Sequence, residues 1–298
     1  GYIGTTGPAV NAGLMGMSAD KAQEFFGYVL EAGKFLKNAG FTLHTGGDKE
    51  KAFVEVFTNI NKDDEDIMVK EYGPQATTPG NTSLFHCWDS MVLPLGEGLA
   101  ANVGAAMQPA WEIMKLYEMP AIIDEDGKPV RFNKIEDLWN TDKMEARARA
   151  TFFFPGMVET ASGTVLDIQA GVYKAYPGLA EDGTFDTSGS ANEYTDTYRV
   201  RAARPGETKS IDNQTVKVNG QHGMAEGTGD EGYSYSGAII RKYVNPSATS
   251  ADRGLFGSTQ PWKVFRYGEV LCNMAEAAYE LGLETGNEAL KQEAFVYI

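Results

Sequence analysis

The chain has 298 residues, of which 41 are acidic and 26 are basic, so its formal net charge is −15. Its composition, 42% hydrophobic and 22% charged, is sufficient for a folded core and excludes a chain that is disordered throughout. The acidic balance excludes nucleic acid as a partner, because phosphate binding requires clustered Lys and Arg. No run of about 18 apolar residues occurs, so no membrane-spanning helix is expected.

The first predicted element is an amphipathic helix over Ala19–Asn38. Its apolar residues recur at helical spacing, Ser18 is a good N-cap, and Gly40 supplies a left-handed stop. A short helix is predicted over Lys49–Asn59. We therefore expect residues 1–59 to be helical.

The pattern changes between residues 60 and 262, where short apolar runs alternate with loops rich in Gly, Asn, Ser and Thr. The runs predicted to be strands are Ile67–Tyr72, Ala150–Phe154, Thr164–Ile168, Tyr198–Ala202, Val216–Val218 and Ala238–Val244. A helix is predicted over Gln108–Tyr117 and a turn at Asp126-Gly127. The polar stretches 177–197 and 219–235 are too long for simple connections, and long loops commonly carry function.

Helical periodicity returns over Phe265–Leu283, and a second helix is predicted over Asn287–Ile298. Because this last pattern continues to the final residue and the chain starts at Gly1, we expect a fragment truncated at both ends. The predicted organisation is a helical scaffold at 1–59, a loop-rich ligand-binding region at 60–262 and C-terminal scaffold helices at 263–298. All three are expected to form one domain.

Motifs of catalysis or cofactor binding are missing from the sequence. It contains no nucleotide-binding glycine motif, no H-E-x-x-H and no G-x-S-x-G. Its two cysteines, Cys87 and Cys272, are far apart, and its three histidines are isolated. The acidic run Asn61–Asp66 lacks the spacing of a calcium loop. We predict no cofactor, no metal site and no catalytic residues.

Trp88 is the most informative aromatic residue, because it lies between residues 79–83 and 96–104, two stretches rich in small residues. Its indole is either an anchor that fixes the loop or a platform exposed to ligand. An exposed indole stacks on the apolar face of a sugar, while neighbouring polar groups bind the hydroxyls. The residues predicted to bind ligand are Trp88, Tyr72, His86, Asp89 and Asn81.

The segment Phe265–Gly282 closely resembles a signature of the SusD/RagB family of outer-membrane nutrient-binding lipoproteins, approximately R-Y-A-E-V-L-L-x-Y-A-E-A. Gly268 stands in place of the usual Ala and Met274 in place of the usual Tyr. Three further segments resemble the family in the same order. These are Ala22–Leu43, Gln108–Met119 with Asp126-Gly127, and Glu145–Gly156, in which Glu145-Ala146 replaces the family's Asp-Pro.

The resemblance implies a mainly α fold, in which a tetratricopeptide-like α-superhelical scaffold carries a long loop-rich insertion with short β-strands. It also implies a non-catalytic protein on the bacterial cell surface. Such a protein is lipid-anchored to the outer membrane through an N-terminal Cys that this sequence lacks. It would deliver oligosaccharides or polysaccharides to a SusC-like, TonB-dependent transporter. The family has no fixed sugar-binding motif, so the predicted site rests on the stacking argument alone.

Two alternatives remain open at this stage. The chain is a structural or protein-binding scaffold of the transporter complex if its aromatic residues are all loop anchors. It is a secreted glycoside hydrolase if two of its 41 acidic residues flank a scissile bond. The first alternative predicts transporter binding without glycan binding, and the second predicts cleavage products.

Overall fold

The structure is a computed structural model, and its contacts divide the chain into two compact units. The first unit contains residues up to 45, 61–70 and 262–298, and the second contains 46–60 and 71–261. The residues that the structure describes are 21–73, 85–96, 98–100, 104–114, 116–117, 144–168, 206, 208–211, 214–217, 220–222, 237–254 and 257–298.

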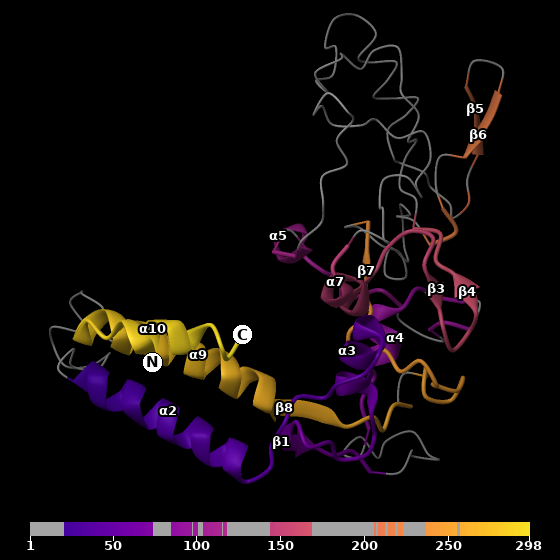
Figure 1. The fold of residues 1–298 in the computed structure, drawn as a ribbon. Coiled ribbons are helices and arrows are strands. Elements are labelled where there is room, and N and C mark those ends of the chain that lie inside the picture. The colour runs from indigo at the N-terminus through magenta and orange to yellow at the C-terminus, as the bar shows by residue number, and fades with distance from the viewer. Residues whose placement is uncertain are drawn as a thin grey trace, which may run out of the picture. The chain divides into compact units, whose positions relative to one another are not determined.

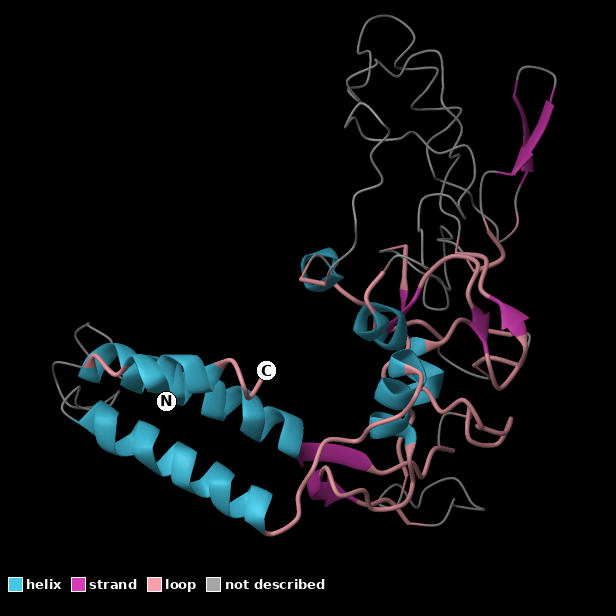
Figure 2. Cartoon of the chain, viewed as in Figure 1, coloured by secondary structure: helices cyan, strands magenta, loops and turns pink. Residues whose placement is uncertain are grey.

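Helices contain more of the described residues than strands do (Figure 2). The described helices are α2 (Ala22–Asn38), α3 (Lys49–Thr58), α4 (Trp88–Val92), α5 (Trp111–Met114), α7 (Ala146–Thr151), α9 (Tyr267–Thr285) and α10 (Glu288–Ala294). The described strands are β1 (Asp66–Lys70), β2 (Phe152–Phe153), β3 (Val158–Glu159), β4 (Thr164–Val165), β5 (Thr208–Ile211), β6 (Gln214–Lys217), β7 (Ile239–Ile240) and β8 (Trp262–Arg266). None of the described helices has the length and apolar character needed to cross a bilayer.

In the first unit, α2 and α9 lie side by side and run antiparallel (Figure 1). Their apolar faces share one core that includes Leu30, Tyr267 and Met274. Gly33 allows this close approach, because a Cβ placed there would lie 2.1 Å from Sδ of Met274. The apolar periodicity of these two segments predicted helices with buried faces, and the structure confirms that the two faces pack against each other.

The turn between α9 and α10 also depends on glycine. Gly286 ends α9 in the left-handed conformation, with φ of 66°, and Asn287 caps α10 through its side chain. Gly282 lies against α10, since a Cβ there would be 2.6 Å from Cγ of Lys291. Helix α10 ends at Ala294, earlier than the sequence pattern indicated, and the ring of Phe295 packs edge-on against Tyr279.

Strands β1 and β8 form an antiparallel pair within the first unit. The pair is joined by ion pairs between neighbouring side chains. Lys263 Nζ lies 2.5 Å from Asp66 Oδ2, and Arg266 contacts Glu65. Both carboxylates are buried, so these pairs satisfy charges that would otherwise be costly to remove from water.

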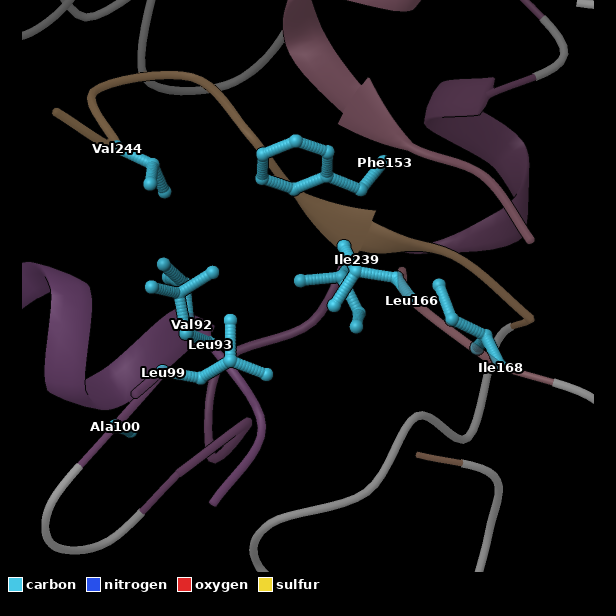
Figure 3. Packing of buried hydrophobic residues seen from close by; sticks show 9 residues of the cluster. All are labelled: Val92, Leu93, Leu99, Ala100, Phe153, Leu166, Ile168, Ile239 and Val244. Carbon is cyan, nitrogen blue, oxygen red and sulfur yellow. The ribbon is translucent and has the colours of Figure 1, made fainter. Parts of the chain in front are cut away.

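The second unit has its own core, which gathers residues from distant parts of the sequence. Figure 3 shows side chains from α4, the loop after it, β2, β7 and the segment after β4 brought together. The buried members are Val92, Leu93, Leu99, Ala100, Phe153, Leu166, Ile168, Ile239 and Val244. The described strands of this unit pair only in twos, β2 with β7, β3 with β4 and β5 with β6.

The strands expected over Thr164–Ile168 and Ala238–Val244 are shortened to β4 and β7, and two further predicted elements differ more strongly from the structure. The helix expected over Gln108–Tyr117 is confined to α5, because several N–H groups around it bond to oxygens three residues back, as in tight turns. The first two residues of the strand expected over Ala150–Phe154 instead end α7, whose Ala- and Arg-rich sequence favours helix. The predicted elements Tyr198–Ala202 and Asp126-Gly127 lie outside the described residues.

Candidate binding site

Four of the five residues predicted to bind ligand lie in the described part of the second unit. These residues are Tyr72, His86, Trp88 and Asp89, whereas Asn81 lies outside the described residues. Three of the four are in mutual contact through His86. We refer to Tyr72, His86, Trp88 and Tyr243, a neighbour that the sequence did not indicate, as the aromatic cluster.

His86 is fixed by its backbone and by its ring. Its backbone N–H donates to the Ser258 carbonyl at 2.8 Å, and the Ser258 N–H donates to the His86 carbonyl at 3.1 Å. Ring atom Nε2 lies 2.9 Å from the carbonyl oxygen of Gln260. The ring also packs edge-on against Tyr72, with the two centroids 4.7 Å apart. His86 thus attaches the start of α4 to the 258–260 segment.

Trp88 is the first residue of α4 and is held at two points. Its backbone N–H donates to Nδ1 of His86 at 3.2 Å, and its indole Nε1–H donates to the Lys242 carbonyl at 2.9 Å. The indole packs edge-on against Tyr243, with centroids 6.3 Å apart, and contacts the second unit's core. The side chain is partly buried and retains contact with solvent.

The backbone that receives the indole is itself unusual. Tyr243 has a φ of 69°, a left-handed conformation that is unfavourable for a residue with a side chain. The buried side-chain amide of Gln260 donates a hydrogen bond to the Tyr243 carbonyl at 3.0 Å. It also donates to the Phe57 carbonyl at 3.1 Å. The Phe57 and Tyr243 rings pack 5.0 Å apart. Gln260 therefore stabilises the strained turn on which Trp88 rests.

Asp89, next to Trp88, lies inside the protein and is only 1% exposed. Its Oδ1 accepts a hydrogen bond from the Asn245 N–H at 3.3 Å, while its Oδ2 has no hydrogen-bond partner among the described residues. Burial raises the pKa of Asp89 to about 6, against the opposing effects of that hydrogen bond and of the Arg253 charge. This position favours a role in supporting α4.

A second buried polar contact fixes the loops around the core. Arg253 Nη2 lies 2.8 Å from Glu159 Oε2, and these side chains are 2% and 1% exposed. Arg253 Nη1 also donates to the Gly98 carbonyl at 2.7 Å. Burial acts to raise the pKa of Glu159, but hydrogen bonds from Ser162 and Arg253 outweigh it and hold that pKa below its usual value. One arginine thus joins the loop at 94–100 to the β3–β4 hairpin.

No pattern in the sequence indicated a role for Gln260, Arg253 or Glu159. Each acts through a partner far away in the chain, and a single polar residue leaves no periodic pattern. The aromatic cluster offers ring surfaces and backbone-anchored polar atoms, which suit stacking and hydrogen bonding. Asp89 and Glu159 are buried, so neither carboxylate is placed to touch a substrate. The described residues contain no group of three His, Cys, Asp or Glu side chains suited to a metal ion.

Comparison with known proteins gives two similarities. The SusD family model matches residues 64–294. A solved structure of a SusD-like protein from Bacteroides fragilis is similar over 92% of this chain, with a TM-score of 0.50 and 17% identity. This chain spans 43% of that protein's length. No curated protein matches the chain. The structural similarity indicates a SusD-like fold.

Proposed function

The chain belongs to the SusD family, and from this premise we propose that it is a non-catalytic glycan-binding protein of the bacterial cell surface. It would deliver oligosaccharides to a SusC-like, TonB-dependent transporter in the outer membrane, to which a lipid anchor would hold it. The family match over residues 64–294 is the observation that carries this proposal, because it includes all of the aromatic cluster. Proteins of this family are outer-membrane surface lipoproteins that generally bind rather than cleave their ligands.

Within this proposal, Trp88 provides the stacking surface and Tyr72 supports it. Both are partly exposed and both are connected through His86, so a sugar ring would meet aromatic groups whose positions are fixed in advance. Preorganised contacts lower the entropy that binding must otherwise overcome. Asp89 would support the helix that carries Trp88, and Asn81 would provide a polar contact.

A second candidate function is a protein-binding scaffold of the transporter complex. The observation in its favour is the attachment of Trp88, whose indole N–H is bonded to Lys242 and whose ring contacts the core. A tryptophan that only anchors its loop would make the same contacts. In that case the aromatic cluster would maintain a surface for the transporter and would not touch sugar.

The test is a screen of neutral and acidic polysaccharides for binding to the wild type, followed by analysis of the mixtures for cleavage products. The proposal predicts binding to at least one glycan without any products. Capture of the transporter without any glycan binding would favour the scaffold, and cleavage products would establish a hydrolase. For a glycan that binds the wild type, Tyr72→Ala should weaken binding, whereas the control Tyr28→Ala should not, because Tyr28 is an exposed tyrosine on α2 and lies outside the aromatic cluster.

A further inference from the structure

The contacts of His86 determine which ring nitrogen carries the proton. A backbone N–H can only donate, so the 3.2 Å contact from Trp88 N requires Nδ1 of His86 to be an unprotonated acceptor. The neutral ring then carries its proton on Nε2, which donates to the Gln260 carbonyl at 2.9 Å. In this state, both described polar contacts of the ring are satisfied by backbone groups.

The Trp88 N–H needs this acceptor because it belongs to the first turn of a helix. First-turn N–H groups have no partner within their own helix and are usually satisfied by a capping side chain. Cys87, at the N-cap position of α4, makes no side-chain capping hydrogen bond. The His86 ring therefore performs the capping role one residue earlier in the chain.

We propose that His86 is a pH-responsive positioning residue, which holds Trp88 in place when its ring is neutral and releases the start of α4 when its ring is protonated. A proton on Nδ1 would place an N–H against the Trp88 N–H, and the hydrogen bond would be replaced by repulsion. His86 would thus act on ligand binding through Trp88. That consequence rests on the proposed glycan-binding function, whereas the capping switch itself does not.

Other titratable groups near His86 must be separated from it in the test. Helix α4 brings Cys87 and the buried Asp89, and the segment on the other side of the ring brings Tyr72, preceded by the exposed Glu71. The residues at 257–260 carry no charged side chain. Asp89 requires a control, because burial raises its pKa to about 6 and its protonation relieves a buried charge.

Two substitutions of His86 separate its contacts. In His86→Asn, the amide oxygen replaces Nδ1 as an acceptor for the Trp88 N–H but does not titrate. In His86→Gln, the amide nitrogen reaches the position of Nε2 and no acceptor remains at the position of Nδ1. Asp89→Asn keeps an acceptor for the Asn245 N–H and removes the buried charge.

The experiment is NMR of the unliganded protein between pH 7.5 and pH 5, a range in which histidines commonly titrate. It records the ring nitrogens of His86 and the hydrogen exchange of the Trp88 backbone amide, corrected for intrinsic rates. We expect the Nε2–H tautomer at pH 7.5 and at least a tenfold loss of Trp88 protection as the ring becomes protonated. Asp89→Asn should retain this change, and His86→Asn should stay protected at both pH values. His86→Gln should be unprotected at both.

An Nδ1–H tautomer at pH 7.5, or equal Trp88 protection at both pH values in the wild type, would overturn the inference. So would a pH response that persists in His86→Asn. If His86→Asn does not fold, the wild-type tautomer and the His86→Gln result still decide. Failure to bind any glycan would count against the proposed function alone, because no ligand is used in these measurements.

Discussion

Both units of this chain contain a buried ion pair, but their cores are assembled differently. In the first unit, α2 and α9 bury continuous apolar faces, and Gly33 lets the helices approach closely. In the second unit, an apolar core is supplemented by buried polar side chains that reach backbone groups far away in sequence, as Gln260 does for Phe57 and Tyr243. The comparison shows how a loop-rich region with little regular structure can still hold an aromatic residue in a defined place.

The largest expected effect comes from removing the buried arginine of the second unit. Arg253→Met leaves the carboxylate of Glu159 buried without its partner, which should lower the free energy of unfolding by about 3–5 kcal/mol. The measurement is urea-induced unfolding monitored by circular dichroism. Arg147→Met is the matched control, because Arg147 is 67% exposed in its ion pair with Glu145 and should change stability by less than about 1 kcal/mol.

The double variant Arg253→Met, Glu159→Leu sharpens this result. It removes both charges, so it should be more stable than Arg253→Met alone. Equal losses for Arg253→Met and Arg147→Met would mean that the second unit does not depend on its buried ion pair.

The next largest effect is a pH-dependent gain from Asp89→Asn. The pKa of Asp89 is raised to about 6 by burial, so the folded state keeps a proton that the unfolded state has already lost at that pH. The wild type's free energy of unfolding should therefore decrease as the pH rises from 4 to 6, and this group should account for up to about 3 kcal/mol of the decrease. Asp89→Asn should remove this component and be the more stable protein at pH 7.5.

Thermal unfolding of the two proteins from pH 4 to pH 7.5 measures the effect. The difference between them isolates Asp89 from groups whose pKa is lowered, such as Glu159, which act in the opposite sense. If the stability difference between the two proteins stayed constant across this range, the Asp89 carboxyl would not have the raised pKa that its burial implies.

In the first unit, the matched pair Gly33→Ala and Gly27→Ala tests close helix packing. A Cβ at Gly33 would collide with the buried side chain of Met274, which should destabilise the protein by about 1–3 kcal/mol. Gly27 is also in α2 and has open space around it, so alanine there should stabilise the helix by up to about 1 kcal/mol. The two variants are compared by chemical denaturation. Shifts of the same sign would contradict the observed packing of α2 on α9.

The smallest effect is expected from the partly exposed pair of Asp63 and His44 in the first unit, whose side-chain atoms lie 2.6 Å apart. Burial acts to raise the pKa of Asp63, but hydrogen bonds from the Glu65 N–H and from His44 outweigh it and lower that pKa. The carboxylate therefore contributes stability above its unfolded pKa, and this contribution is lost as the pH falls through the lowered value.

Asp63→Asn should lower stability by about 0.5–1 kcal/mol at pH 7, as measured by thermal unfolding. Asp64→Asn is the control, because Asp64 is exposed and should have almost no effect. A larger loss of stability for Asp64→Asn than for Asp63→Asn would contradict the stabilising role given to Asp63.

The same contrast between units explains what the sequence could predict. Helices α2, α3 and α9 have repeating apolar residues, and these three were expected near their observed bounds. The strands of the second unit are short, and each run predicted as a strand within the described residues overlaps an observed strand that differs from it in extent. The contacts of Arg253 and Gln260 could not be predicted from the sequence. Arg253 pairs with Glu159 and Gln260 bonds to Phe57, and both partners are far away along the chain. Trp88 was recognisable because an aromatic residue stood among small ones.

The most direct test of the account is the affinity of Trp88 variants for a glycan that binds the wild type, measured by isothermal titration calorimetry at pH 7.5. If Trp88 is the stacking surface, Trp88→Ala should weaken binding at least tenfold, while Trp88→Phe should retain most of the affinity because a ring remains. The control Tyr28→Ala should bind as the wild type does. Unchanged affinity in a folded Trp88→Ala protein would contradict the account and leave Trp88 as an anchor of its loop.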